Sequence, residues 1–365
     1  MIIKSVSLQN FRNYKNLSLV LGSDTNIFFG DNAQGKTNIL EAVYLSGTTR
    51  SHRGSKDREM ILLTEEEAHI CTILEKEGID HKIDIHLRRN RTKGIAIDGI
   101  PIRKASELFG LIYFVVFSPE DLSIIKNGPA ERRKFMDTEL CQLDKVYLYH
   151  LSSYNKAVIQ RNKLLKELYF RPDYREILEI LDMQLVKYGK EIICRRRAFS
   201  GELNEMIHDI HLRLSGGEEN MLLTYECSVR EDDFEESLKK NRDRDIHTKT
   251  TTVGPHRDDL SFQVNGLDIR RFGSQGQQRT TALSLKLSEI ELVKQRVHDT
   301  PVLLLDDVMS ELDEKRQKYL LESIDQVQTL ITCTGLDEMI GRCLTVNRIY
   351  RVSNGNVTLE NGREA

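Results

Sequence analysis

The chain lacks cysteines spaced as C-x-x-C, long apolar runs and an excess of charge of one sign. Its 365 residues carry 53 Lys and Arg against 56 Asp and Glu, a formal net charge of −3. Charge therefore gives no global basic footprint, and any nucleic-acid surface must be local. The six cysteines are scattered along the chain. This favours reduced thiols in a cytosolic protein over a disulfide framework or a zinc site.

The pattern also shows no targeting or membrane segment. Residues 1–5 do not form a basic stretch followed by an apolar one, as a signal peptide would. The longest apolar run, residues 111–117, is far too short to cross a bilayer, although it is typical of a buried strand. We therefore expect a cytoplasmic protein with no membrane partner. The length allows two or three domains with a sizeable core.

The strongest signal lies in residues 26–41. The apolar run 27–29 predicts a buried strand, residues 30–37 match G-x-x-x-x-G-K-[ST], and apolar periodicity from residue 38 predicts a helix. In such a strand–loop–helix unit, backbone N–H groups and the helix N-terminus cradle phosphate. The alternative is a chance match in a glycine turn. We expect a triphosphate site with bound Mg²⁺.

Individual roles in this loop follow from the motif. Lys36 would reach the β- and γ-phosphates, and the Thr37 hydroxyl would bind Mg²⁺. An arginine in an earlier turn, Arg12, lies beside aromatic residues and could meet a base or a phosphate, but an ordinary hairpin turn fits equally well. The residues predicted to bind ATP are Gly30, Asp31, Asn32, Ala33, Gln34, Gly35, Lys36, Thr37, Asn38 and Arg12.

A second motif supplies acidic groups. Residues 302–305 are four aliphatic residues followed by Asp306 and Asp307. The aliphatic run predicts a central parallel strand, and acids at its C-terminal end lie where ligands bind in open α/β sheets. Asp306 suits the Walker B role of holding Mg²⁺, and Asp307 could position or deprotonate the attacking water. With Lys36, they form the predicted catalytic set.

A third motif lies between the first two and opens a long amphipathic helix. It consists of Ser274, Gln275, Gly276 and Gln277, with Ser274 as the expected N-cap. An acidic loop containing Asp313 follows Asp306. A signature serine, a Walker B strand and such a D-loop, in this order, resemble the head of ABC-type ATPases. In those heads the signature acts in trans, on the nucleotide bound by a partner subunit.

Another segment matches the usual signature string more closely. Residues 214–218 read Leu-Ser-Gly-Gly-Glu. They follow a helix instead of opening one, and they lie far upstream of Asp306. We interpret them as a glycine turn that ends a helix, and we place the signature at Ser274.

The rest of the pattern indicates three parts. Alternation within residues 68–98 predicts an antiparallel sheet beside the phosphate-loop core, and helical periodicity from about residue 130 to 214, broken at 171–173, predicts two long helices. Residues 221–227 predict a strand that returns the chain to the sheet domain. The expected division is an ATPase head at 1–125 and 216–365, with an inserted α-helical lobe at 126–215.

The chain resembles the bacterial RecF family of SMC-type ATPases. The resemblance rests on residues 11–14, 30–41, 119–137 and 253–260 together with the Asp306-Asp307 pair, and it covers the whole chain in order. It implies an α/β fold: an ABC-type P-loop ATPase head, with a mixed sheet plus an antiparallel β subdomain and an inserted α-helical domain.

Three positions depart from the general ABC pattern. The Q-loop region, residues 118–121, has no glutamine; Asp307 replaces the usual catalytic Glu; and residues 332–334, Thr-Cys-Thr, stand near the expected switch histidine. Hydrolysis roles known from transporters therefore do not transfer directly.

The resemblance also implies a function. RecF proteins are ATP-dependent, DNA-binding recombination mediators for gaps and stalled replication. An ATP-dependent homodimer on double-stranded DNA or ss/dsDNA junctions, with weak DNA-stimulated ATPase activity, would act with RecR and RecO to help RecA loading. The alternative function is the nucleotide-binding domain of an ABC transporter. A small-molecule P-loop kinase or a purely structural SMC-type role is a more distant possibility.

Overall fold

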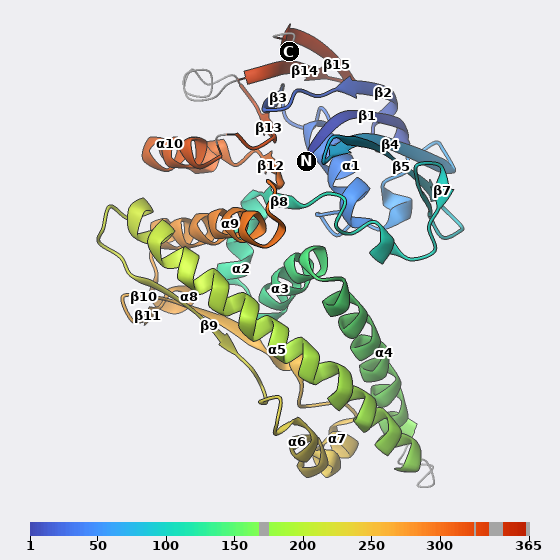
Figure 1. Ribbon diagram of the computed structural model, residues 1–365, viewed down its shortest axis with the longest axis vertical. Helices are drawn as coiled ribbons and strands as arrows, with labels where there is room; N and C mark the ends of the chain where they lie inside the picture. The colour runs from blue at the N-terminus through green and yellow to red at the C-terminus, as the bar shows by residue number, and fades with distance from the viewer. Residues whose placement is uncertain (168–174, 325, 336–345, 363–365) are drawn as a thin grey trace. The chain divides into compact units, whose positions relative to one another are not determined.

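The computed structural model describes residues 1–167, 175–324, 326–335 and 346–362 (Figure 1). It separates into two compact units, one made of residues 1–121 and 286–365 and the other of residues 122–285. The expected helical break at residues 171–173 lies outside the described residues. The second unit is longer than the expected lobe at 126–215, because residues 221–285 pack with its helices.

The first unit contains a six-stranded mixed sheet in the order β15-β14-β3-β13-β12-β8. All neighbouring pairs are parallel except β14 with β15. The predicted acidic strand, β12, is buried along its whole length and has a neighbour on each side, as its aliphatic run predicts. The strand expected at residues 111–117 is shorter. The strands are β3 (Thr25–Phe29), β8 (Phe114–Phe117), β12 (Val302–Asp306), β13 (Thr329–Cys333), β14 (Val346–Ser353) and β15 (Asn356–Gly362).

The same unit contains the predicted antiparallel sheet, in the order β2-β1-β4-β5-β6-β7. Helix α1 (Lys36–Thr48) contacts strands of both sheets, and residues 39–48 are all buried. These contacts on several sides bury polar residues of the helix as well, among them Glu41, Ser46 and Thr48. The strands are β1 (Ile2–Phe11), β2 (Tyr14–Val20), β4 (Glu67–Lys76), β5 (Ile79–Arg88), β6 (Gly94–Ile97) and β7 (Ile100–Pro101).

The second unit is built on two long antiparallel helices, α4 and α5, which lie side by side (Figure 1). Both were predicted. Helix α9 starts in this unit and continues into residues of the first. The helices are α2 (Leu122–Lys126), α3 (Pro129–Leu143), α4 (Lys145–Glu167), α5 (Arg175–Leu214), α6 (Phe234–Lys240), α7 (Arg242–Thr248), α8 (Ile269–Phe272) and α9 (Gln275–Val297).

The prediction that residues 221–227 return the chain to the sheet domain is wrong. The strand at residues 221–227, β9 (Met221–Glu226), does not rejoin the sheets of the first unit. It pairs with β10 (Asp259–Val264), which pairs with β11 (Leu267–Asp268), and it packs against α5. Its buried residues Met221 and Leu223 alternate with exposed ones, so one apolar face is enough to cover a helix without joining a larger sheet. The chain turns between β10 and β11 at residues 265–266.

The remaining elements are short. The first unit includes helix α10 (Glu314–Ser323), and five 3₁₀ turns occur along the described chain: η1 (Asp57–Glu59), η2 (Ala105–Glu107), η3 (Pro119–Asp121), η5 (Pro255–Arg257) and η6 (Met309–Glu311). Within the described ranges, no helix is long and apolar enough to cross a membrane.

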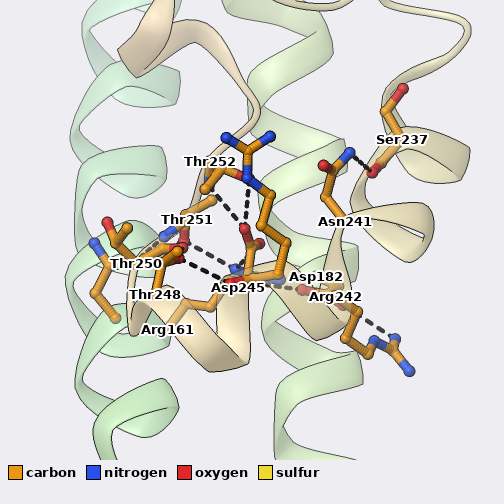
Figure 2. A network of polar contacts seen from close by, with 12 residues as sticks. Arg161, Asp182, Ser237, Asn241, Arg242, Asp245, Thr248, Thr250, Thr251 and Thr252 are labelled. Carbon is orange, nitrogen blue, oxygen red and sulfur yellow. Dashed lines mark hydrogen bonds and ion pairs between the residues drawn. The ribbon is translucent and has the colours of Figure 1, made fainter.

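A buried polar network joins α4, α5 and α7 in the second unit (Figure 2). Arg161 is fully buried, and its guanidinium lies 2.6 Å from Asp182 and 2.7 Å from Asp245. Asp245, also fully buried, accepts hydrogen bonds from the backbone N–H and the hydroxyl of Thr252, at 3.0 and 2.6 Å. Since buried charges persist only with partners, this network fixes α7 and the following segment against the long helices.

His256 lies in the segment that follows this network. Its Nε2 donates to the carbonyl of Thr251 at 3.0 Å. Nδ1 is then the acceptor for the Tyr154 hydroxyl at 2.7 Å, so the neutral ring is fully hydrogen-bonded. Burial lowers the pKa of His256 to about 4.

Candidate functional site

The predicted phosphate loop connects β3 to α1 in the first unit. Gly30 and Gly35 have φ angles of +151° and +113°. A Cβ atom on Gly30 would lie 2.2 Å from the Val352 carbonyl oxygen, and one on Gly35 would lie 2.5 Å from Asn13 Nδ2. Both positions therefore require glycine. Helix α1 begins at Lys36 without a side-chain cap, which leaves the N–H groups of Lys36 and Thr37 available to an anion.

Two β-turns brace this loop. In the β1–β2 turn, Asn13 Nδ2 donates to the Gln34 carbonyl and the Tyr14 hydroxyl donates to the Gly35 carbonyl, each at 3.0 Å. Asn38 Nδ2 donates to Asn13 Oδ1 at 2.8 Å. In the β14–β15 turn, the Asn354 N–H donates to Gln34 Oε1 at 2.5 Å. Of the predicted residues, Gln34 and Asn38 therefore shape the loop, whereas Asp31, Asn32 and Ala33 form its exposed rim.

Lys36 lies inside the loop, as the motif predicts. Its side chain is buried, and Nζ donates to the carbonyls of Gly30 at 2.6 Å and Asp31 at 2.9 Å. An ammonium held by two carbonyls can exchange one of them for a phosphate oxygen. The loop thus holds a fixed positive charge within its ring of backbone groups.

The two halves of the predicted metal site meet. Thr37, at the start of α1, donates from Oγ1 to Oδ1 of Asp306, at the end of β12, over 2.8 Å. Thr332 of β13 donates to the same oxygen, also at 2.8 Å. A hydroxyl and a carboxylate are hard oxygen donors of the kind that Mg²⁺ prefers. The residues present therefore fit this cation.

Asp307 follows directly and has an unusual backbone. Its φ is +52°, in the left-handed region, and its N–H donates to Thr332 Oγ1 at 2.9 Å. Burial raises the pKa of the Asp307 carboxyl; the Lys36 charge opposes this change and the Asp306 charge adds to it. Thr332, near the place of the missing switch histidine, thus orients both acids.

Arg12 lies in the hairpin turn between β1 and β2, one of the two settings expected for it. Its Nε and Nη2 each donate to a carboxylate oxygen of Glu41 at 2.7 Å, and Nη1 donates to the Glu59 carbonyl at 2.8 Å. Although burial opposes it, hydrogen bonds from Arg12 and Ser51 hold the pKa of Glu41 below its ordinary value. These contacts make Arg12 a brace between the first turn and α1. Its contact with ATP remains a prediction.

His52, in the basic loop at residues 50–54, is half-buried and lies near these groups. Both ring nitrogens of His52 are buried without a hydrogen-bond partner among the described residues, and its ring lies edge-on to Tyr44 at 5.6 Å. Burial lowers the pKa of His52, against the opposing charges of Asp306 and Glu41.

The predicted signature lies in the second unit, at the start of α9. Ser274 Oγ accepts from the Gln277 N–H at 3.2 Å, and the Ser274 N–H donates to Gln277 Oε1 at 2.9 Å. This reciprocal pair is a capping box and confirms Ser274 as the N-cap. Ser274, Gln275 and Gly276 are exposed. The start of α9, including the backbone of Gln275 and Gly276, therefore faces solvent.

Two further segments that the sequence singled out lie at helix ends. Asp313, predicted to be a D-loop residue, caps α10 by accepting from the Arg316 N–H at 2.9 Å. The Leu-Ser-Gly-Gly-Glu string at 214–218 ends α5, as predicted, where the Gly217 N–H donates to the Leu212 carbonyl at 2.7 Å.

The chain matches a described family along almost its whole length. The family model of the RecF/RecN/SMC N-terminal domain matches residues 2–358. A protein of Agathobacter rectalis named DNA replication and repair protein RecF is 60% identical over 357 residues, covering 98% of this chain and 99% of that protein. A protein of the same name from Lachnospira eligens is 56% identical, covering 99% of this chain and 100% of its own length. Another, from Clostridium botulinum, is 44% identical, covering 98% of this chain and 99% of its own length.

Solved structures agree with these relatives. A structure described as the recombination mediator protein RecF-ATP in the RecFOR pathway superposes with a TM-score of 0.91 at 35% identity, covering 98% of this chain and 97% of that chain. An Smc head bound to the C-winged helix domain of ScpA has a TM-score of 0.58 at 16% identity, covering 98% and 97%, which speaks for the fold alone. The expected ABC-type ATPase head is confirmed. The chain belongs to the RecF/RecN/SMC N-terminal domain family and, within it, to the RecF proteins.

Proposed function

We propose that this chain is an ATP-dependent recombination mediator in DNA repair and replication, and that ATP gates its homodimer. The observation that carries the proposal is the 2.8 Å contact between Thr37 and Asp306, which joins the phosphate loop to the acidic strand. We favour this function over a transporter subunit because relatives that are similar along the whole chain carry DNA repair and replication names.

Nucleotide binding follows from the groups of the first unit. Lys36 and the uncapped N–H groups of α1 would hold the β- and γ-phosphates. Thr37 and Asp306 would hold Mg²⁺, which neutralises charge on the phosphate oxygens during phosphoryl transfer. Asp307 would orient the attacking water and accept its proton.

We expect hydrolysis to be slow. Asp307 is one methylene shorter than Glu, so its carboxylate must reach farther to the attacking water. Turnover should stay below about 10 s⁻¹, the median for enzymes, even with DNA present. A steady-state ATPase assay with and without DNA measures this, and faster turnover would contradict the proposed switch.

The exposed signature suggests how ATP would gate a dimer. Ser274 and the N–H groups of the first turn of α9 would bind the γ-phosphate held at Lys36 of a second subunit, and Asp313 would lie in the same interface. A two-fold symmetric dimer would then enclose two nucleotides. ADP lacks the γ-phosphate, so the dimer should loosen after hydrolysis.

Sedimentation with a non-hydrolysable ATP analogue tests this step. The parent chain should dimerise with the analogue and stay monomeric with ADP. Ser274→Arg should bind the nucleotide as the parent does, because Lys36 is unchanged, but should remain monomeric. Monomers of the parent chain at high concentration with the analogue would refute the gate.

We further propose that the dimer binds double-stranded DNA or ss/dsDNA junctions and acts with RecR and RecO to help RecA loading. Its relatives of solved structure are described as mediators in the RecFOR pathway. Lys and Arg contacts to phosphates would dominate, so affinity should fall steeply with salt and show little sequence preference. Binding of a gapped duplex with ATP, ADP or the analogue, over a salt series, tests this; salt-independent binding would contradict it.

A further inference from the structure

The residue that follows the signature-like segment contacts the signature in the fold. Residues 214–218 lead directly into Glu219, whose Oε1 accepts a hydrogen bond from Nε2 of Gln277 at 2.8 Å. Gln277 is the residue whose Oε1 accepts from the Ser274 N–H at 2.9 Å. One amide therefore joins the carboxylate of Glu219 to the N-cap of α9.

This arrangement fixes the amide of Gln277 in one orientation. A carboxylate only accepts hydrogen bonds and a backbone N–H only donates them. If the amide were flipped, its NH₂ would face the Ser274 N–H and its oxygen would face Glu219. Glu219 thus selects the orientation that closes the capping box.

A buried histidine holds the carboxylate of Glu219 in place. Oε2 of Glu219 lies 3.1 Å from Nε2 of His211, whose side chain is fully buried near the end of α5. His211 Nδ1 lies 2.9 Å from Oγ of Ser284, which is on α9. The chain of hydrogen bonds therefore begins and ends on α9 and passes through the end of α5.

The glycine turn delivers Glu219 to this place. The Gly217 N–H bonds back to the Leu212 carbonyl at 2.7 Å, and Gly217 has a φ of +88°. Ser215 Oγ then accepts from the Glu219 N–H at 3.2 Å. The Ser-Gly-Gly sequence ends the helix, reverses the chain and orients the carboxylate of Glu219. These residues therefore have a structural role, although they resemble a phosphate-binding signature.

We propose that Glu219 is a positioning residue for the signature, and that His211 and Ser284 hold it in place. The proposal rests on the proposed function, in which the first turn of α9 receives the γ-phosphate of a partner subunit. That turn is exposed, so its N–H groups would otherwise meet the phosphate in many conformations. Preorganising them lowers the cost of association.

The test uses substitutions on the full chain. Glu219→Ala removes the acceptor. Gln277→Glu keeps an acceptor for the Ser274 N–H, but it places a second carboxylate against that of Glu219. The double variant Glu219→Gln with Gln277→Glu exchanges the two groups and restores a donor–acceptor pair. Glu218→Ala is the matched control, because Glu218 is the exposed neighbour of Glu219.

Two measurements separate this proposal from the proposed function. Amide hydrogen exchange of residues 272–280 in the nucleotide-free chain reports the capping box, and sedimentation with a non-hydrolysable ATP analogue reports dimerisation. Glu219→Ala and Gln277→Glu should each exchange about tenfold faster and dimerise about tenfold more weakly, as expected for a lost hydrogen bond to a charged group. Analogue affinity should stay at the parent value, which excludes general misfolding.

The double variant decides between positioning and bulk stability. It should recover most of the exchange protection and dimerisation that Gln277→Glu loses, because the coupling belongs to the pair. The proposal is overturned if Glu219→Ala exchanges like the Glu218→Ala control, or if the double variant is no better than Gln277→Glu. Should the parent chain fail to dimerise, the proposed function fails, while hydrogen exchange still decides whether Glu219 holds Gln277.

Discussion

Removing Asp245 should destabilise the second unit strongly. Its carboxylate is fully buried and accepts from Arg161 at 2.7 Å and from both donors of Thr252. Asp245→Ala leaves the Arg161 guanidinium buried with Asp182 as its remaining anion. Breaking a buried ion pair lowers the free energy of unfolding by about 3–5 kcal/mol. Because Asp182 still neutralises Arg161, we expect a loss near the lower end, about 3 kcal/mol. For a unit of this size, that corresponds to a fall in Tm of about 6–12 °C.

Thermal unfolding followed by far-UV circular dichroism measures this effect on the full chain. Asp243→Ala is the control, since Asp243 is an exposed residue in the same turn of α7. It should change Tm by little, because a surface charge near a helix N-terminus contributes less than about 1 kcal/mol. A Tm of Asp245→Ala equal to that of the control would refute the view that this network holds α7 in place.

Three other perturbations have clear expected results. Because the folded pKa of His256 is about 4 against an ordinary 6.5, the unfolded chain protonates first, and stability is lost as pH falls from 6.5 to 4. At about 1.4 kcal/mol per pH unit this loss reaches about 3 kcal/mol, and urea unfolding of His256→Gln should show a pH profile flatter by that amount. Gly30→Ala should abolish ATP binding in calorimetry, because its Cβ would meet the Val352 carbonyl. Asp307→Asn should bind ATP normally but lower the rate of hydrolysis at least about a hundredfold, the lower end of what a lost general base costs.

The sequence was sufficient for the features that depend on local pattern. The loop at residues 30–37, the aliphatic strand before Asp306 and the cap at Ser274 each combine a special residue with a periodicity that changes at a defined point. The Thr37–Asp306 contact was predictable because parallel strands align their carboxyl ends at one edge of a sheet. The structure supplied the distances.

The features that escaped prediction depend on tertiary pairing. The apolar face of β9 could cover a sheet or a helix, and only the fold shows that α5 lies against it. Arg12 could equally meet a phosphate or a carboxylate, and the long-range pairing with Glu41 decides its contacts in this structure. The partnership of Glu219 with Gln277 joins residues 58 positions apart, and no local pattern encodes it.

The most direct test of the central claim mixes two variants that each fail alone. Lys36→Ala lacks the phosphate contact, and Ser274→Arg lacks a usable signature, so with a non-hydrolysable ATP analogue each should sediment as a monomer. An equimolar mixture should form a heterodimer, because one composite site combines the intact Lys36 of one chain with the intact Ser274 of the other. A mixture that remains monomeric, or a Ser274→Arg chain that dimerises like the parent, would contradict an ATP-gated dimer with the signature acting in trans.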